Sequence, residues 1–258
     1  MPSSSESERE EDRTCAEPLV EKTNRESSAP FLGRRSIQDV DSPLSVRELR
    51  DLRSPERLEY LRAVKCLSSI PSTVCHGSLH DEFAYIHRKI GDYSHEAAPF
   101  LPWHRYFIHI YEQTLKQYCQ YEDTLPYWDW THDWANLTQA PVWSTTEGFG
   151  ANGNRLNGTA MAAVLGESDY YGFLLKLEDG PHAAIPITVR GDFSRFTAPN
   201  DPIFFQVRAC AYNGPSRHNS SIAAQLTDPL EMAGLAPDIA VDSVMTIANG
   251  LLCYEYQD

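Results

Sequence analysis

SHEAAPFLPWHRYFIHIYEQTL, residues 94–115, places His95 and His104 nine positions apart in a largely apolar run. Residues on one face of a helix are spaced by three, four or seven, so a single helix cannot direct both imidazoles to one point. Pro99 and Pro102 would also break a helix that spanned the interval. The stretch therefore predicts His95 in a loop and His104 in the first turn of a helix that Pro102 opens. Two imidazoles from different elements can then meet at one metal ion.

The helix expected from about Trp103 to Tyr118 carries His104 on its inward, apolar stripe. Apolar residues follow His104 at the helical offsets of four, seven and eleven, namely Ile108, Tyr111 and Leu115. His109 is rotated from His104 by about 140°, given about 100° per residue, and cannot serve the same metal. One helix therefore directs one histidine inward.

A second helix is expected over residues 79–90, ended by Gly91, and it directs His87 inward. His87 shares its face with Phe83, Ile86 and Ile90. Three neutral imidazoles, from His87, His95 and His104, suit copper or zinc. A lone inward histidine is more often a hydrogen-bonded core residue, and His80, one heptad before His87, is a rival ligand. The remaining candidates are expected at the surface or outside the ligand set: His76, His109, His132 and His218.

The rest of the chain predicts a mainly α domain with long irregular loops. Residues 1–42 are rich in Ser, Glu and Arg and are expected to be disordered. A helix is expected from Ser54 as N-cap to about residue 67, with an apolar stripe formed by Leu58, Leu61, Val64 and Leu67. A weaker helix is expected over residues 159–177, and the chain from residue 180 onward should be mostly irregular.

Composition excludes two classes of partner. The 258 residues contain 22 Lys and Arg against 36 Asp and Glu, a net charge of −14, so nucleic acid is not an expected partner. No apolar run approaches the ~20 residues that cross a bilayer, so no membrane partner is expected. The N-terminus lacks the apolar core of a secretory signal, yet sequons begin at Asn136, Asn157 and Asn219. The six cysteines are dispersed, and both disulfides and buried thiols stay open, so no compartment is assigned.

The residues around this stretch resemble the first copper-binding half of the tyrosinase and catechol oxidase family. The resemblance rests on HEAAPFLPWHRYFIHIYEQTL, on YIH upstream of it and on LPYWDW downstream. GPHAAIP, TAPNDPIFF and the tail APDIAVDSVMTIANGLLCYEY resemble the second half, so that residues 43–258 form a tyrosinase-like domain. The resemblance implies metal ligation by His87, His95, His104 and His182, with supporting roles for Glu112, Trp103, Trp128 and Asp201.

The family resemblance also implies a fold and an activity. We expect a type 3 copper helical bundle with two coppers, each held by three histidines. Reduced copper reacts with O2, and small phenols or catechols are oxidised to ortho-quinones. The expected cofactor is thus copper, and the expected partners are phenolic substrates and O2.

The second half departs from the family pattern. Four residues after His182, where the family has another histidine, stands Pro186. After DPIFF the family continues with Leu-His-His, whereas this chain reads Gln206-Val-Arg before a family-like tail, so residues 206–258 diverge. We therefore expect a bundle truncated in its second half, as in a shortened splice form or gene model. The alternatives to an enzyme are a copper-binding but catalytically silent relative and an O2 carrier of the hemocyanin kind.

Overall fold

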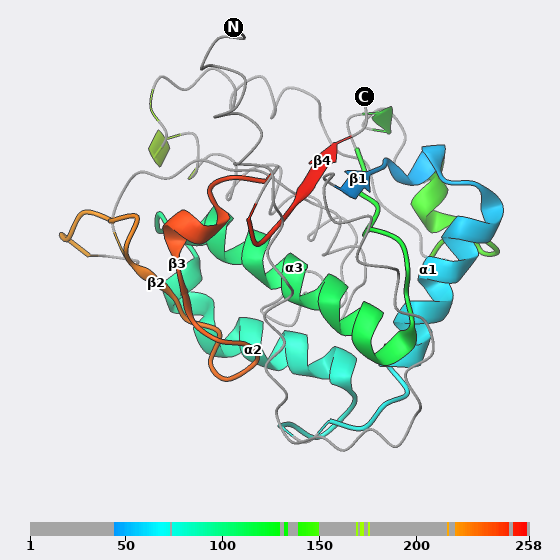
Figure 1. Cartoon of the computed structure of the whole chain (residues 1–258), viewed down its shortest axis with the longest axis horizontal. Coiled ribbons are helices and arrows are strands. Elements are labelled where there is room, and N and C mark those ends of the chain that lie inside the picture. Colours follow the sequence, from blue (N-terminus) through cyan, green and yellow to red (C-terminus); the bar gives the residue numbers. More distant parts are fainter. Residues whose placement is uncertain are drawn as a thin grey trace, which may run out of the picture.

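In the described part of the chain, two helices pack on a third, central helix and form the body of the fold (Figure 1). The computed structural model describes residues 44–149 apart from 73, 130–131 and 134–138, residues 220–256 apart from 248–249, and positions 169, 171, 172, 175 and 216. Helices α1 (Ser54–Leu67) and α2 (Leu79–Ser94) both pack against α3 (Phe100–Cys119) and against each other. The prediction of a mainly α fold is thus confirmed for the described residues. No helix among these residues is long and apolar enough to cross a membrane.

Several sequence expectations fall outside the described residues. These are the N-terminal segment 1–42, Trp130, most of the weaker helix over 159–177, His182, Pro186, Asp201, residues 206–208 and His218.

Helix α1 has the expected span but turns a different face inward. Its N-cap is Arg53, not Ser54, because Ser54 and Pro55 already occupy the first turn. Leu58 is 46% exposed, so the predicted stripe is wrong at its first position. Tyr60 is buried instead, and its ring contacts those of Tyr121 and Phe149. An aromatic contact outside the helix therefore sets the rotation of α1.

Helix α2 begins and packs as predicted but ends later. Ser78 and Asp81 form a capping box at its start, and the predicted inward residues are buried: Phe83, Ile86, His87 and Ile90. Gly91 does not end the helix, which continues to Ser94. A glycine inside a helix costs only about 1 kcal/mol. Here its carbonyl oxygen accepts hydrogen bonds from both the backbone N and the ring Nδ1 of His95, at 3.1 and 2.9 Å.

Helix α3 starts earlier than predicted. Pro99 is its N-cap and Pro102 lies in its first turn, where a missing N–H costs nothing. The first backbone bond runs from the Trp103 N–H to the Pro99 carbonyl, 2.8 Å. His104 therefore sits in the second turn rather than the first. The helix ends at Cys119, after which Gln120 adopts a left-handed conformation with φ 55°.

A disulfide and a strand pair close the described fold. Cys66 of α1 is bonded to Cys119 at the end of α3, which answers part of the cysteine question, while Cys75 is a free thiol. Strand β1 (Leu44–Val46) pairs in parallel with β4 (Tyr254–Tyr256), so the two ends of the described chain meet (Figure 1).

A C-terminal segment crosses the start of α3. This strap, residues 229–244, contains β2 (Pro229–Leu230), β3 (Ile239–Ala240) and the 3-10 helix η11 (Val241–Val244). β2 and β3 pair antiparallel, and η11 packs on α3. The side chains of the strap that are fully shielded from solvent are Leu230, Met232, Val241 and Val244. The strap thus buries the half of α3 that carries His104.

Candidate metal centre

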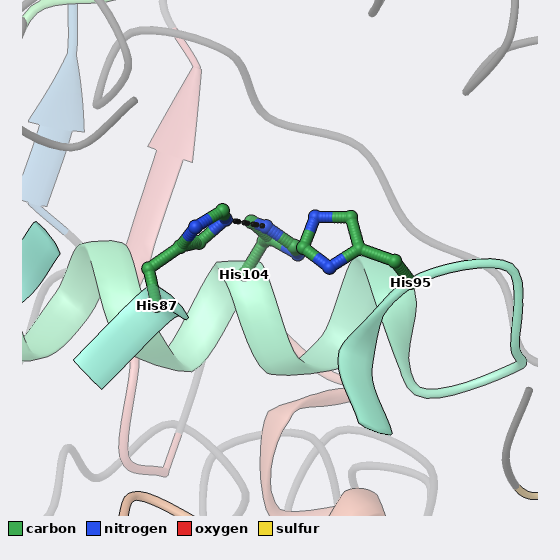
Figure 2. Close-up of side chains that lie close together, drawn as sticks. All are labelled: His87, His95 and His104. Atoms are coloured by element: carbon green, nitrogen blue, oxygen red, sulfur yellow. Dashed lines mark hydrogen bonds between the residues drawn. The ribbon is translucent and has the colours of Figure 1, made fainter. Parts of the chain in front are cut away.

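Three histidine rings converge at the junction of α2 and α3 (Figure 2). His87 comes from α2, His95 is the C-cap of α2, and His104 projects from α3. One ring nitrogen from each lies within 4.8 Å of the others, and the Nε2 atoms of His87 and His104 are 3.2 Å apart. The ring centroids are 4.9 to 5.4 Å apart, with the planes 70° to 84° from parallel. Edges rather than faces therefore point at one centre.

Main-chain carbonyls orient two of the rings. The Nδ1 atom of His104 lies 2.6 Å from the Phe100 oxygen, and that of His95 lies 2.9 Å from the Gly91 oxygen. A carbonyl oxygen only accepts hydrogen bonds, so each Nδ1 carries the proton. In the neutral rings the Nε2 lone pairs are then left for the centre. Such an outer hydrogen bond is the usual way to fix the tautomer of a metal-ligating histidine.

The arrangement fits a metal ion with imidazole ligands. Two nitrogens bound tetrahedrally at ~2.0–2.1 Å are about 3.3 Å apart, close to the His87–His104 separation. The lone pair of His104 Nε2 faces His87 Nε2, so the pair is stabilised either by one shared proton or by one cation. The group of ligand atoms has no carboxylate or thiolate member. Three neutral imidazoles suit copper or zinc.

Aromatic rings surround the centre on its protein side. Trp103 is fully buried, and its ring centroid lies 5.9 Å from that of His87 and 5.0 Å from that of His104. The Trp103 ring also stacks on Phe107 at 4.7 Å. Phe100, likewise buried, contacts the rings of His95 and His104. His87 itself is 3% exposed, whereas His95 and His104 are half-buried, so the centre opens away from these rings.

The strap holds the helices that carry the histidines through side-chain donors. Trp103, Arg105 and Tyr106 of α3 donate to strap carbonyls at 2.9, 2.8 and 3.0 Å, and Tyr93 of α2 does the same. The acceptors, in that order, are Glu231, Val244, Pro237 and Pro229. Burial raises the pKa of Tyr106 to about 12, so its hydroxyl stays a donor. The strap thus fixes the orientation of α2 and α3 beside the centre.

Glu112 and Trp128 anchor the loop that follows α3. Glu112 is eight residues beyond His104, about 12 Å along the helix at 1.5 Å per residue. Its carboxylate accepts from Lys116 Nζ at 2.7 Å and from the Leu125 N–H at 3.0 Å. Trp128 is buried, and its indole N–H donates to Asp133 at 2.8 Å.

The sequence predicts that Trp103, Tyr127, Trp128 and Trp130 are largely buried and pack α3 against the loop that follows it, and this prediction needs one correction. Trp103 packs under the strap, and Trp128 packs edge-on against Trp143, so the two do not join α3 to the following loop. Tyr127 is half-buried and contacts Tyr256. The backbone of Tyr127, in the LPYWDW motif, exchanges hydrogen bonds with the backbone of residues 47 and 49. The aromatic motif thus joins the loop to the start of the described chain.

The other described histidines lie outside the ligand group. His80 is buried, its ring contacts the Tyr111 ring edge-on, and burial lowers its pKa, so the rival ligand belongs to the core. His109 stacks on Tyr106, His132 pairs with Asp129 at the surface, and His76 is exposed.

Sequence patterns missed the groups that orient the rings. The carbonyls of Gly91 and Phe100 are main-chain atoms, for which no side-chain motif exists. Ser94, whose Oγ lies 3.1 Å from His95 Nδ1, had a sequence signal only in its position next to a candidate ligand. The side chains of α3 that donate to the strap bond to carbonyls more than 120 positions away along the chain. Nothing in the local sequence marks such pairs.

Comparison with known proteins gives this geometry a context. Residues 77–174 match the family model described as the common central domain of tyrosinase. The chain is 32% identical to the tyrosinase-like protein phomQ1' of Diaporthe leptostromiformis, covering 85% of this chain and 81% of the relative. It is 30% identical to the tyrosinase ustQ of Aspergillus flavus, covering 83% and 80%. The fold resembles a polyphenol oxidase from Thermothelomyces thermophila, with a TM-score of 0.68, 21% identity, and coverage of 84% and 89%.

Proposed function

The chain belongs to the tyrosinase family of copper oxidoreductases, and from this premise we propose that it oxidises phenols or catechols to ortho-quinones with O2. His87, His95 and His104 are the proposed copper ligands. The observation that carries the proposal is the convergence of their ring nitrogens within 4.8 Å, with the Nδ1 atoms of His95 and His104 bonded to carbonyls.

The residues around the centre would each contribute to this reaction. Copper held by His87, His95 and His104 would supply the redox chemistry that passes electrons from the phenol to O2. The carbonyls of Gly91 and Phe100 keep the Nε2 lone pairs of His95 and His104 directed at the metal. Trp103 and Phe100 exclude water from the protein side, so substrate must enter from the half-exposed side of His95 and His104.

A copper-binding but catalytically silent relative is the second candidate. Of the second ligand set implied by the family resemblance, His182 is present, but Pro186 stands where a histidine is expected. The alignment with phomQ1' runs over 307 positions, more than the 258 residues of this chain, so the relative contains residues with no counterpart here. The first observation supports an incomplete second ligand set, and the second shows that this chain lacks residues that phomQ1' has. In that case His182 would be the single histidine of the second ligand set, and Asp201 would have a supporting role beside it.

Copper content and quinone formation, measured on the same sample, distinguish these candidates. The full chain is loaded with copper, the metal per molecule is counted, and catechol oxidation is followed by quinone absorbance. Two coppers with turnover support the enzyme, and one copper without turnover supports the silent relative. Two coppers with reversible O2 binding and no turnover would indicate a carrier.

Matched variants on α3 test the ligand assignment. His104→Ala should lose copper at this centre, because it removes one of three imidazoles. His109→Ala, on the same helix but rotated away, is the control and should retain it. A wild-type chain that takes up no copper, or a His104→Ala variant that binds it as tightly as wild type, would refute the proposal.

A further inference from the structure

We infer that Ser94 is a positioning residue of the metal centre, which fixes the ring of His95 through its hydroxyl. The inference rests on the proposed function, in which His95 is a copper ligand. It concerns a side chain that neither the ligand motif nor the family resemblance singles out.

The Ser94 hydroxyl oxygen and the Gly91 carbonyl oxygen both lie within hydrogen-bond distance of His95 Nδ1. Ser94 is the last residue of α2 and is 0% exposed, and its Oγ lies 3.1 Å from His95 Nδ1. The Gly91 oxygen lies 2.9 Å from the same nitrogen and can only accept, so Nδ1 is the donor. The Ser94 oxygen therefore accepts as well, and the Nδ1–H is held between two acceptors in a three-centre hydrogen bond.

His95 requires such a constraint more than the other two ligands do. His87 and His104 stand on helices, which fix the direction of the Cα–Cβ bond. His95 is an extended C-cap with φ −114° and ψ 151°, followed by Glu96 in the left-handed region at φ 50°. Beyond Ser94 the regular helical backbone no longer directs the side chain. Two acceptors on one N–H limit rotation of the ring about the Cβ–Cγ bond, which a single acceptor permits.

Its burial supports a role for the hydroxyl at this position. A buried hydroxyl without a hydrogen bond is costly, and serine is a poorer helix former than alanine. Alanine would fill this position at the end of α2 without either cost. The contact with His95 is the observed interaction that offsets both costs. It also orients Nε2 of His95 toward the nitrogens of His87 and His104.

Ser94→Ala tests the inference, with Ser68→Ala, an exposed serine at the end of another helix, as the control. Ser68 is the C-cap of α1, and its hydroxyl bonds to the Val64 carbonyl at 3.0 Å, far from any ligand in sequence. Copper(I) affinity is measured on the full chain by competition with a chelator. Loss of an outer hydrogen bond to a ligand typically weakens metal binding about 10–100-fold. Because the Gly91 carbonyl remains, we expect about tenfold for Ser94→Ala and no change for Ser68→Ala.

Two further measurements separate positioning from folding. The thermal melting curve of metal-free Ser94→Ala should match wild type, while the X-ray absorption spectrum of the copper-loaded chain should change with the ligand geometry. Unchanged affinity and spectrum in Ser94→Ala, with wild type binding copper, would overturn this inference alone. Equal losses in Ser94→Ala and Ser68→Ala would also overturn it, because they would reflect stability. A wild-type chain that binds no copper overturns the proposed function and this inference together.

Discussion

The two halves of α3 are held in different ways. Residues 100–108 carry His104 and are fastened by side-chain donors to backbone carbonyls of the strap. Residues 111–119 are fastened by the disulfide to α1, by the Glu112 carboxylate and by the fully buried side chains of Tyr111 and Leu115. One helix thus joins a region that shapes a metal centre to a region that only has to stay folded.

Because the two halves are held differently, mutations should be able to change the stability of the fold without changing metal binding. Changes in the second half should lower the free energy of unfolding and leave copper affinity in the folded chain intact. Changes in the first half should affect both, because there the same residues pack the core and contact the ligand rings. The variants below test this separation.

The largest effect is expected for Trp103→Ala in the first half. Trp103 is fully buried, stacks on Phe107 and contacts the rings of His87 and His104. Truncating such a residue should lower the free energy of unfolding by about 3–5 kcal/mol. Copper affinity should fall as well, because the rings of His87 and His104 both lose their contact with Trp103. Chemical denaturation and chelator competition measure the two effects.

Trp103→Phe separates packing from the hydrogen bond to the strap. Phenylalanine keeps a ring on Phe107 but loses the donor to the Glu231 carbonyl. We expect a smaller loss of stability and retention of most copper affinity. Full copper affinity in a folded Trp103→Ala variant would show that the ring has no part in placing the histidines.

The disulfide sets the stability of the second half. Cys66 and Cys119 are 53 positions apart, and a cross-link of that span is worth about 4 kcal/mol by the loop-entropy estimate. The double variant Cys66→Ser, Cys119→Ser should lose about this much while binding copper as wild type does. Cys75→Ser, which removes a free thiol, is the control. A weaker copper site in the double variant would contradict the separation of the two halves.

Next in size is Glu112→Gln, at the start of the second half. Glu112 is 7% exposed, and its two oxygens accept from Lys116 and from the Leu125 backbone. The amide leaves one of these donors facing an NH2 group, which should cost about 1–3 kcal/mol. Exposed Glu122→Gln should stay within about 0.5 kcal/mol of wild type. Changed copper stoichiometry in Glu112→Gln would instead assign Glu112 to the centre.

Sequence reasoning predicted that His87, His95 and His104 lie together, but it did not predict the groups that hold them in place. Helical periodicity placed His87 and His104 inward, and two prolines placed His95 between the helices, because these signals are local. Periodicity failed for Leu58, where an aromatic contact from Tyr121 and Phe149 decides which face of α1 is buried. The expectation that Gly91 ends the helix failed, because the hydrogen bonds that extend α2 involve His95 and are known only from the structure.

Long-range pairing accounts for the rest. The strap meets α3 through backbone carbonyls, which carry no residue-specific signal, and pairing of Cys66 with Cys119 is one of many combinations of six cysteines. Tertiary contact, not propensity, sets these features. Mutating the donors rather than the acceptors is therefore the direct way to probe the strap.

The smallest effect concerns acid stability and tests the second half alone. His80 packs against Tyr111, and burial lowers its pKa below the ordinary 6.5, an effect that Asp81 partly opposes. The unfolded chain therefore takes up a proton near pH 6.5 that the folded chain does not. The stability from the neutral ring is fully present above pH 6.5 and is lost as the pH falls toward the folded-state pKa.

His80→Phe should therefore reduce the dependence of stability on pH below 6.5. The phenylalanine ring can keep the contact with Tyr111 but does not titrate. The slope of the unfolding free energy against pH should become shallower by at most about 1.4 kcal/mol per pH unit, the value for one proton. Groups that are the same in both proteins cancel in the difference between denaturation curves at pH 7.5 and pH 5.5. Replacing the exposed His76 by Gln is the control. An identical slope in His80→Phe and wild type would mean that the core around Tyr111 admits the proton, and that the second half of α3 is less closed than its burial indicates.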